Sequence, residues 1–170
     1  MRRFGIIGKP LEHSYSAIYF TDKFARESIC AEYRLYEIDD LSGIATLMSV
    51  LDGFNVTYPY KQAIIPHLQS IDTVAAEIGA VNVVSHGCGY NTDWIGFKQS
   101  VMPHLRDTDQ RALVLGTGGV SKAVQYALRD MGIPENPRSM SAEDWALVDD
   151  FGAVGDGKTD STAAIQAAMN

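Results

Sequence analysis

Apolar residues follow two spacings along the first 133 positions. Short runs rich in β-branched and aromatic residues, typical of strands, alternate with stretches whose apolar residues recur every three or four positions, typical of helices. The expected strands span 4–8, 32–38, 54–57, 81–85 and 112–115, and the expected helices span 16–29, 41–51, 60–68, 72–78, 94–104 and 120–131. This alternation predicts an α/β fold of βαβ units around a largely parallel sheet.

Local signals refine these elements. The helix 16–29 carries Ala17, Phe20 and Phe24 on one face, which predicts the side that packs on the sheet. The segment 87–89, with two glycines, predicts a turn. Gly132 predicts the end of the last helix, since glycine is favoured just past a helix C-terminus.

A different pattern begins after Pro134. Residues 135–170 contain two basic and seven acidic residues, and the run 136–141 has the proline and small polar residues of a linker. Beyond it we expect a strand at 145–148, a loop at 152–157 and a short helix capped by Asp160. The chain is therefore predicted to have three parts, which span residues 1–105, 106–134 and 135–170; the second is a single βα unit and the third is a tail.

The strand 112–115 raises a question of pairing. Both of its faces are apolar, so it is expected to have neighbours. We expect the tail strand around Leu147 to pair with it through a right-handed crossover, or its edge to drive formation of a homo-oligomer.

Composition places the chain among globular proteins. Its 170 residues are 46% hydrophobic and 21% charged, which excludes collagen, a coiled coil and general disorder. The net charge of -7 disfavours nucleic acid and anionic membranes as partners, because both are negatively charged. No apolar run approaches the ~20 residues of a membrane span, and residues 1–9 lack the apolar core of a signal peptide. We therefore expect a cytoplasmic protein.

The cysteines and histidines show no pattern of a disulfide framework or a metal site. Cys30 and Cys88 are far apart in the sequence and are expected to be reduced thiols. The histidines form no HExxH motif and no i,i+4 pair, so no metal is expected. They are His13, His67, His86 and His104.

Two serines at a helix start are the first candidate ligand groups. Ser14 and Ser16 lie where helix 16–29 begins, and a hydroxyl there commonly caps the helix by accepting backbone N–H bonds. The same hydroxyls, turned outward beside the free N–H groups of the helix, bind a carboxylate. On this segment alone both interpretations stay open.

A lysine follows the strand 54–57. The strand places Asn55 and Thr57 on one face, and the turn at Pro59 then directs Lys61 across the end of the strand. A lysine in a partly dehydrated cleft transfers protons near neutral pH, because desolvation favours its neutral form. The alternative is a solvated lysine on the first turn of a helix, which is the more common outcome.

The remaining candidate site residues are one aspartate and two asparagines. Asp93 can cap the helix that follows it, and within reach of Lys61 it would also hold the ammonium in position. Asn82 and Asn91 supply the donors and acceptors that bind a polyhydroxylated ring.

The segment 116–121 has the context of a dinucleotide-binding loop. Gly116, Gly118 and Gly119 lie between the strand 112–115 and a helix that begins at Val120. Glycines there let the backbone approach a pyrophosphate at the positive end of the helix. A charged residue at the end of a second strand about 20 positions later would distinguish NAD from NADP, but residues 134–137 show no recognisable strand.

Five ordered motifs together resemble the shikimate dehydrogenase family. They are Gly8-Lys9-Pro10 with His13-Ser14-Tyr15-Ser16, Gly53-Phe54-Asn55-Val56-Thr57-Tyr58-Pro59-Tyr60-Lys61, Gly79-Ala80-Val81-Asn82, Gly89-Tyr90-Asn91-Thr92-Asp93-Trp94-Ile95-Gly96, and Leu115-Gly116-Thr117-Gly118-Gly119. The resemblance covers about residues 1–133. It implies a reversible, NADP-linked reduction of 3-dehydroshikimate to shikimate, with a small-molecule substrate as the partner.

The resemblance also implies residue roles. Lys61, held by Asp93, would transfer the proton by general acid catalysis. The substrate carboxylate would contact Ser14 and Ser16, and the rest of the substrate would contact Thr57, Asn82 and Asp93. The residues implied to bind NADP are Gly116, Gly118, Gly119 and Val120.

After the glycine loop the sequence departs from this family. Residues 148–168 resemble the opening segment of right-handed β-helix proteins, such as pectate-lyase-like and phage tailspike domains, but no repeats follow. We therefore predict a chimera that lacks most of the nucleotide-binding part, with weak shikimate binding and little or no turnover. Two alternatives are a fragment of a carbohydrate-binding tailspike protein and a shikimate-binding module without catalysis.

Overall fold

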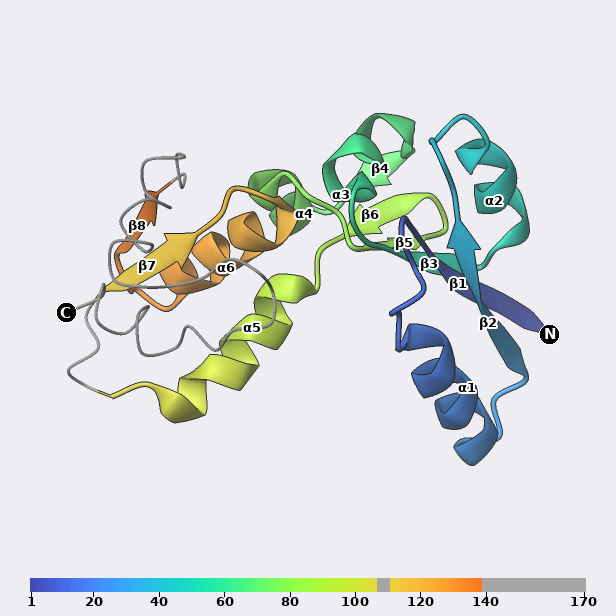
Figure 1. Cartoon of the computed structure of the whole chain (residues 1–170), viewed down its shortest axis with the longest axis horizontal. Coiled ribbons are helices and arrows are strands. Elements are labelled where there is room, and N and C mark those ends of the chain that lie inside the picture. The colour runs from blue at the N-terminus through green and yellow to red at the C-terminus, as the bar shows by residue number, and fades with distance from the viewer. Residues whose placement is uncertain (107–110, 139–170) are drawn as a thin grey trace.

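The chain forms two sheets with helices around and between them (Figure 1). This computed structural model describes residues 1–106 and 111–138. The six-stranded sheet contains β1 (Arg2–Gly8), β2 (Ala31–Glu37), β3 (Gly53–Val56), β4 (Ser70–Ile71), β5 (Val83–Ser85) and β6 (Cys88–Tyr90). The helices beside it are α1 (Ser16–Arg26), α2 (Ile44–Val50), α3 (Tyr60–Ala63) and α4 (Thr73–Ile78), with a 3-10 helix at Ile65–His67. The second unit contains α5 (Asp93–Val101), a 3-10 helix at Met102–His104, β7 (Ala112–Leu115), α6 (Gly119–Asp130) and β8 (Glu135–Arg138).

The six-stranded sheet is mixed in direction. In the order β2-β1-β3-β5-β6-β4, β5 runs antiparallel to both of its neighbours, and the other pairs are parallel. β5 and β6 form a hairpin whose connecting residues His86 and Gly87 have φ of 48° and 74°, the positive values that a tight hairpin requires. The α/β fold is therefore confirmed. The prediction of a largely parallel sheet is wrong at β5, and the turn predicted at 87–89 lies at 86–87.

Helices cover both faces of this sheet (Figure 1). One face carries Ile6, against which α1 packs, and the other carries Ile7 and Val56 in the larger core under α2 and α3. Neighbouring residues of β1 thus serve different cores, because successive strand side chains point to opposite faces. The residues of α1 in this packing are the three predicted from the sequence, Ala17, Phe20 and Phe24.

Prolines shorten two of the predicted helices. The stretch 60–68 is divided into α3 and a 3-10 turn that contains Pro66, and the stretch 94–104 ends in a 3-10 turn that contains Pro103. Proline removes a helical N–H donor and clashes with the preceding turn, so each α-helix stops before it.

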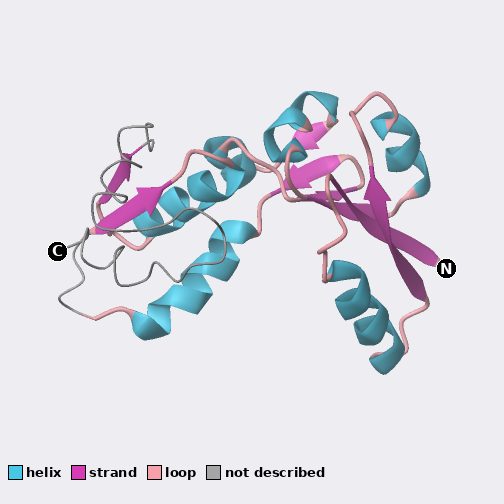
Figure 2. Ribbon diagram, in the orientation of Figure 1, coloured by secondary structure: helices cyan, strands magenta, loops and turns pink. Residues whose placement is uncertain are grey.

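The second unit is a βαβ motif, in which α6 connects two parallel strands (Figure 2). β7 and β8 pair from Ala112 with Glu135 to Leu115 with Arg138. The linker predicted from 136 onward is therefore wrong for residues 136–138, and the unit predicted to end at 134 continues to Arg138. Pro137 concealed this strand in the sequence, yet an edge strand tolerates proline.

Among the described residues the partner of β7 is β8. The strand predicted around Leu147 and its pairing with β7 lie outside the described residues. The predicted elements at 145–148, 152–157 and 160–170 lie outside the described residues.

Both ends of α4 are set by specific residues. The Asp72 carboxylate accepts the N–H groups of Val74 and Ala75 at 3.0 and 3.3 Å, and the helix ends at Gly79, whose φ is 70°. These are the standard N-terminal and C-terminal stop signals of a helix. They fix the direction in which the chain leaves α4 toward residues 80–82.

Replacing Asp72 by alanine is expected to lower the free energy of unfolding by about 1 kcal/mol, because two helix N–H groups lose their acceptor. Urea unfolding followed by circular dichroism measures this loss. Glu77→Ala, which removes the same charge from an exposed position of α4, serves as the matched control. Equal stability of the two variants would contradict the capping role.

Candidate active site

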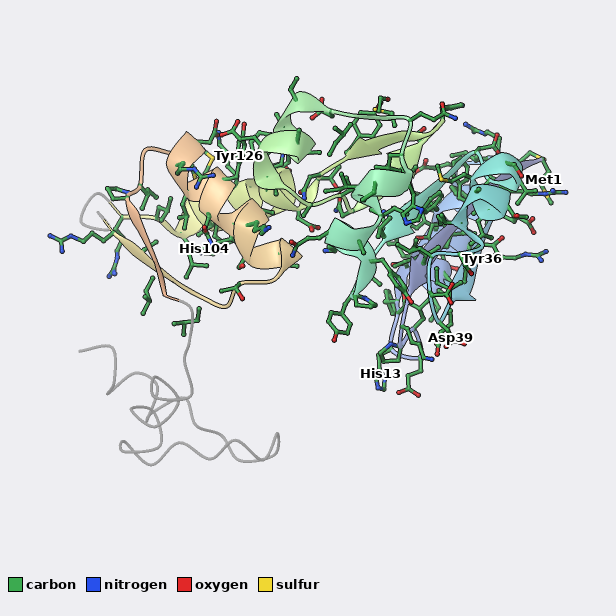
Figure 3. The ribbon with its side chains drawn as sticks, turned by 90° about the horizontal axis from the view of Figure 1, so that it is seen from above. Met1, His13, Tyr36, Asp39, His104 and Tyr126 are labelled. Carbon is green, nitrogen blue, oxygen red and sulfur yellow. The ribbon has the colours of Figure 1, made fainter. Side chains whose placement is uncertain are left out.

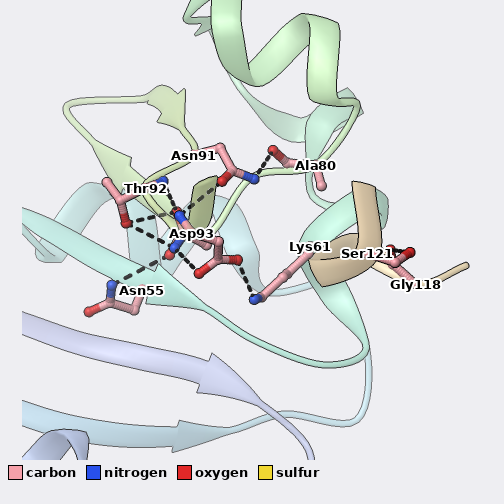
Figure 4. Close-up of polar contacts among 9 residues, drawn as sticks. Asn55, Lys61, Ala80, Asn91, Thr92, Asp93, Gly118 and Ser121 are labelled. Carbon is pink, nitrogen blue, oxygen red and sulfur yellow. Dashed lines mark hydrogen bonds and ion pairs between the residues drawn. The ribbon is translucent and has the colours of Figure 1, made fainter. Parts of the chain in front are cut away.

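A lysine and an aspartate from different helices form an ion pair at one end of the sheet (Figure 4). Lys61 is the second residue of α3, and Asp93 is the first residue of α5. The Lys61 Nζ donates to Asp93 Oδ2 at 2.7 Å, and the two side chains are 15% and 26% exposed. The predicted contact between them is therefore present, in a partly dehydrated position.

The backbone around Lys61 is tied to the same region. Its carbonyl accepts the Val81 N–H at 2.7 Å, which connects α3 to the segment just before β5. The turn leading into α3 is closed by a bond from the Tyr60 N–H to the Thr57 carbonyl at 2.9 Å. Lys61 is thus a lysine with a fixed backbone and a defined partner, and the alternative of a freely solvated lysine is wrong.

Asn82 holds the carboxylate of Asp93. Its Nδ2 donates to Asp93 Oδ1 at 2.7 Å and to Thr92 Oγ1 at 3.0 Å, while its Oδ1 accepts the Thr92 N–H at 2.8 Å. Asn82 is 8% exposed. Both oxygens of Asp93 are consequently engaged, one by an amide and one by an ammonium. A substrate contact by Asn82, as predicted from the sequence, requires one of its two N–H groups to be released.

Asn91 positions the start of α5. Its Nδ2 donates to the Ala80 carbonyl at 2.9 Å, its Oδ1 accepts the Asp93 N–H at 3.0 Å, and it is 5% exposed. The interpretation of Asn91 as a group that binds a polyhydroxylated ring is therefore wrong, because a buried amide with internal partners does not face the cleft. The expectation that Asp93 caps its helix is also wrong, since Thr92 takes the N-cap position.

The two loops that carry the remaining predicted groups touch each other. The Lys9 N–H donates to the Tyr58 carbonyl at 3.0 Å, which places the loop before α1 beside the loop before α3. The peptide bonds preceding Pro10 and Pro59 are both cis. The serine and threonine segments, separated by about 40 positions in the sequence, therefore meet at the same end of the sheet.

Neither serine acts as the cap of α1. The N-cap residue is Tyr15, and no side chain accepts a capping bond there. Ser14 and Ser16 are both partly exposed. The capping interpretation is thus wrong, and the two hydroxyls remain candidates for binding a ligand.

The glycine loop approaches Lys61 directly. Gly118 is the N-cap residue of α6 and Gly119 is its first residue. A Cβ atom at Gly119 would lie 3.1 Å from the Lys61 Cβ, closer than ordinary packing allows. Gly116 has a φ of 109°, in the region that favours glycine. The loop therefore needs glycine at 116 for its turn and at 119 for its contact with α3.

A side chain on α6 adds a further tie to the first unit. Lys122 Nζ donates to Gln62 Oε1 of α3 at 2.9 Å, which holds α6 against α3. Within the second unit, Lys98 Nζ of α5 donates to Asp130 Oδ2 of α6 at 2.6 Å. Sequence reasoning missed these contacts, because nothing in the local pattern marks either lysine as different from a solvated one.

A cleft of about 280 Å³ lies between the two units. It is lined by Thr57, Tyr58, Pro59, Lys61, Gln62, Gly118, Gly119 and Val120. An ammonium has three N–H donors, and the bond to Asp93 uses one of them, so Lys61 can donate to an oxygen in this cleft. The free N–H groups at the start of α6 face an anion favourably. The arrangement suits proton transfer beside a bound phosphate group.

The described residues contain no group of three or more histidine, cysteine, aspartate or glutamate side chains that could hold a metal ion. Figure 3 shows His13 in the first unit and His104 in the second. Within residues 1–106 and 111–138 no helix is long and apolar enough to cross a membrane.

Comparisons with known proteins point to one family. Residues 6–84 match the family model of the shikimate dehydrogenase substrate binding domain. A shikimate dehydrogenase (NADP(+)) of Bacillus cereus strain B4264 is 38% identical over 144 residues, which cover 78% of this chain and 51% of that protein. A Bacillus anthracis relative of the same name is 38% identical over 146 residues, covering 79% and 52%. The chain thus spans about half the length of the curated relatives it matches.

Solved structures of shikimate dehydrogenases also match this chain. The crystal structure of shikimate dehydrogenase from Thermotoga maritima shares 33% identity with a TM-score of 0.73, over 85% of this chain and 57% of that one. The Thermus thermophilus enzyme in complex with shikimate shares 30% identity with a TM-score of 0.75, over 89% and 62%. Residues 6–84 of this chain are therefore similar to the shikimate dehydrogenase substrate-binding domain.

Proposed function

We propose that this chain binds shikimate and takes part in its NADP-linked interconversion with 3-dehydroshikimate. The observation that carries the proposal is the Lys61–Asp93 ion pair, which lies in direct contact with a glycine loop at a helix start. The same pairing of a proton donor with a dinucleotide loop is what a hydride-transfer site needs. The relatives are NADP(+) shikimate dehydrogenases, and one structural neighbour is in complex with NADP(H) and shikimate.

We assign substrate binding and nucleotide binding to different parts of the chain. We assign residues 1–105 to substrate binding and the βαβ unit to nucleotide binding, extended from the predicted 106–134 to Arg138 because β8 pairs with β7. Within the first part, Ser14 and Ser16 are the donors for the substrate carboxylate, with Thr57, Asn82 and Asp93 around the rest of the ring. The oligomeric state of the chain stays a prediction.

The nucleotide-binding unit fits a dinucleotide on structural grounds. A Cβ atom at Gly118 would meet nothing within 4 Å, so the loop leaves open space beside the N–H groups of α6. Gly116, Gly118, Gly119 and Val120 are the residues that would hold the pyrophosphate.

In the proposed reaction NADP supplies or accepts the hydride when bound. During reduction, negative charge develops on the substrate oxygen at the carbon that receives the hydride, and the Lys61 ammonium donates a proton to that oxygen. Asp93 keeps the ammonium in place, and Asn82 keeps Asp93 in place. In the reverse direction the lysine receives the proton from the hydroxyl.

Ser14→Ala is expected to weaken shikimate binding about tenfold to a hundredfold, because a hydrogen bond to a carboxylate is lost. Isothermal calorimetry with the 170-residue chain measures the affinity. Ser49→Ala on α2, whose hydroxyl bonds only locally to the Thr46 carbonyl, is the control and should bind normally. Unchanged affinity of the Ser14 variant would remove this serine from the site.

Lys61→Met is expected to slow NADP⁺ reduction by shikimate about 10²- to 10⁴-fold, the usual contribution of a positioned proton-transfer group. A single-turnover measurement of NADPH absorbance with the protein in excess isolates the hydride-transfer step and is the appropriate assay. Lys23→Met on α1, whose ammonium pairs with Glu27, is the control. A Lys61 variant as fast as the unsubstituted chain would overturn the proposal.

A further inference from the structure

One edge of the six-stranded sheet has no partner strand among the described residues. β2 is the last strand at that edge, and within residues 1–106 and 111–138 it pairs with β1 alone. The pairing runs without a bulge over all seven residues of β2, and the strand contains no proline. Bulges and prolines are common means by which proteins protect a sheet edge. The β2 edge has neither, so another strand can pair with it.

Alternate residues of β2 direct their backbone groups to this edge. Just before the strand, the Cys30 carbonyl accepts the Arg2 N–H at 3.1 Å. Just after it, the Ile38 N–H donates to the Gly8 carbonyl at 3.4 Å. The even-numbered positions therefore face β1. Because successive residues of a strand alternate in direction, the N–H and carbonyl groups of the odd-numbered positions, such as Tyr33, face the unpaired side.

An apolar surface adjoins the edge. Leu35 shares the face of β2 that carries the buried Tyr33, yet it is 41% exposed. Helix α1 packs against β2 (Figure 1), and its residues Ile18 and Tyr19 are 54% and 51% exposed. A second β2 strand that arrived with its own α1 would cover apolar side chains on both elements, which is favourable.

The other face of β2 carries two charges of opposite sign. Glu32 and Arg34 are two positions apart, and the Arg34 guanidinium donates to the Glu32 carboxylate at 2.7 and 3.0 Å. A guanidinium has more N–H donors than these bonds use, and the Arg34 side chain is 65% exposed. Arg34 can therefore bind a second carboxylate that approaches from the edge.

Antiparallel pairing of two β2 strands has one register in which these charges meet. When Tyr33 lies opposite Tyr33 of a second copy, each Glu32 lies opposite an Arg34. The tyrosines then form a hydrogen-bonded pair, and the charged residues form non-hydrogen-bonded pairs, in which side chains are closest. The small Ala31 lies opposite Leu35 and leaves room for it. A shift of the centre by one residue would place like charges opposite each other, which is destabilising.

We propose that the β2 edge is an interface between two copies of this chain, which pair antiparallel about a two-fold axis at Tyr33 and join their sheets into one. The partner is a second copy because the complementary charges lie on one strand and meet when that strand is repeated in the opposite direction. This interface differs from the one expected at the strand 112–115. It does not depend on the proposed function.

Sedimentation velocity of the 170-residue chain is expected to give a dimer of twice 18.6 kDa. Arg34→Glu is expected to raise the dissociation constant of the dimer about tenfold or more, because two attractive cross-strand pairs become repulsive. Arg106→Glu, the same change of charge at an exposed position of the second unit, is the control. A monomeric unsubstituted chain, or equal dissociation constants for the two variants, would overturn the proposal.

Mixing two variants tests the register. Arg34→Glu has acidic residues at both 32 and 34, and Glu32→Arg has basic residues at both. Each variant alone is expected to be mostly monomeric, whereas an equimolar mixture is expected to form the dimer, because every acidic residue then faces a basic one. Circular dichroism of each variant checks that it is folded. Folded variants that stay monomeric when mixed contradict the proposed pairing.

Hydrogen exchange of the unsubstituted chain tests the interface without any substitution. Peptides that contain Tyr33 and Leu35 are expected to exchange more slowly as the protein concentration rises, because their N–H groups become bonded in the dimer. Peptides from β7 are expected to exchange at a constant rate. Concentration-dependent protection of β7 and not of β2 would place the interface in the second unit and overturn the proposal.

Discussion

The bond between the Lys61 ammonium and the Asp93 carboxylate is the interaction on which the site depends. The segment 81–82 bonds to both partners. The Val81 N–H donates to the Lys61 carbonyl, and the Asn82 side chain donates to the Asp93 carboxylate. A carboxylate with both oxygens engaged cannot rotate freely, so the lysine receives a fixed partner at a fixed place. Preorganisation of this kind lets a charged group act without rearrangement during the reaction.

Buried amides supply much of this rigidity. Asn82 and Asn91 each bond to groups at the start of α5, and burial makes an unpaired amide costly. The chain therefore uses their donors and acceptors to set the geometry of the first turn of α5, where Asp93 lies. The Tyr33 hydroxyl is likewise buried and hydrogen-bonded, since it donates to Asn55 Oδ1 at 2.7 Å.

The glycine loop at the start of α6 lies against Lys61 of the first unit. Gly119 allows α6 to approach Lys61 at a distance that a side chain would prevent, and the bond between Lys122 and Gln62 keeps the helix there. A glycine loop is a weak signal by itself. Its position against the proton-transfer pair is what connects nucleotide binding to substrate chemistry in the proposed function.

Local rules in the sequence determined most of the helices and strands up to β7 and the face of α1 marked by Phe20 and Phe24, because periodicity and caps act over a few residues. The short strands β4 and β6 were not predicted. Only the tertiary structure decided the antiparallel direction of β5, the strand at Glu135–Arg138 that Pro137 concealed, the internal role of Asn91, and the reach of Tyr33 to Asn55. These features depend on partners distant in the chain. A donor or acceptor has no defined role until folding brings its partner within about 3 Å.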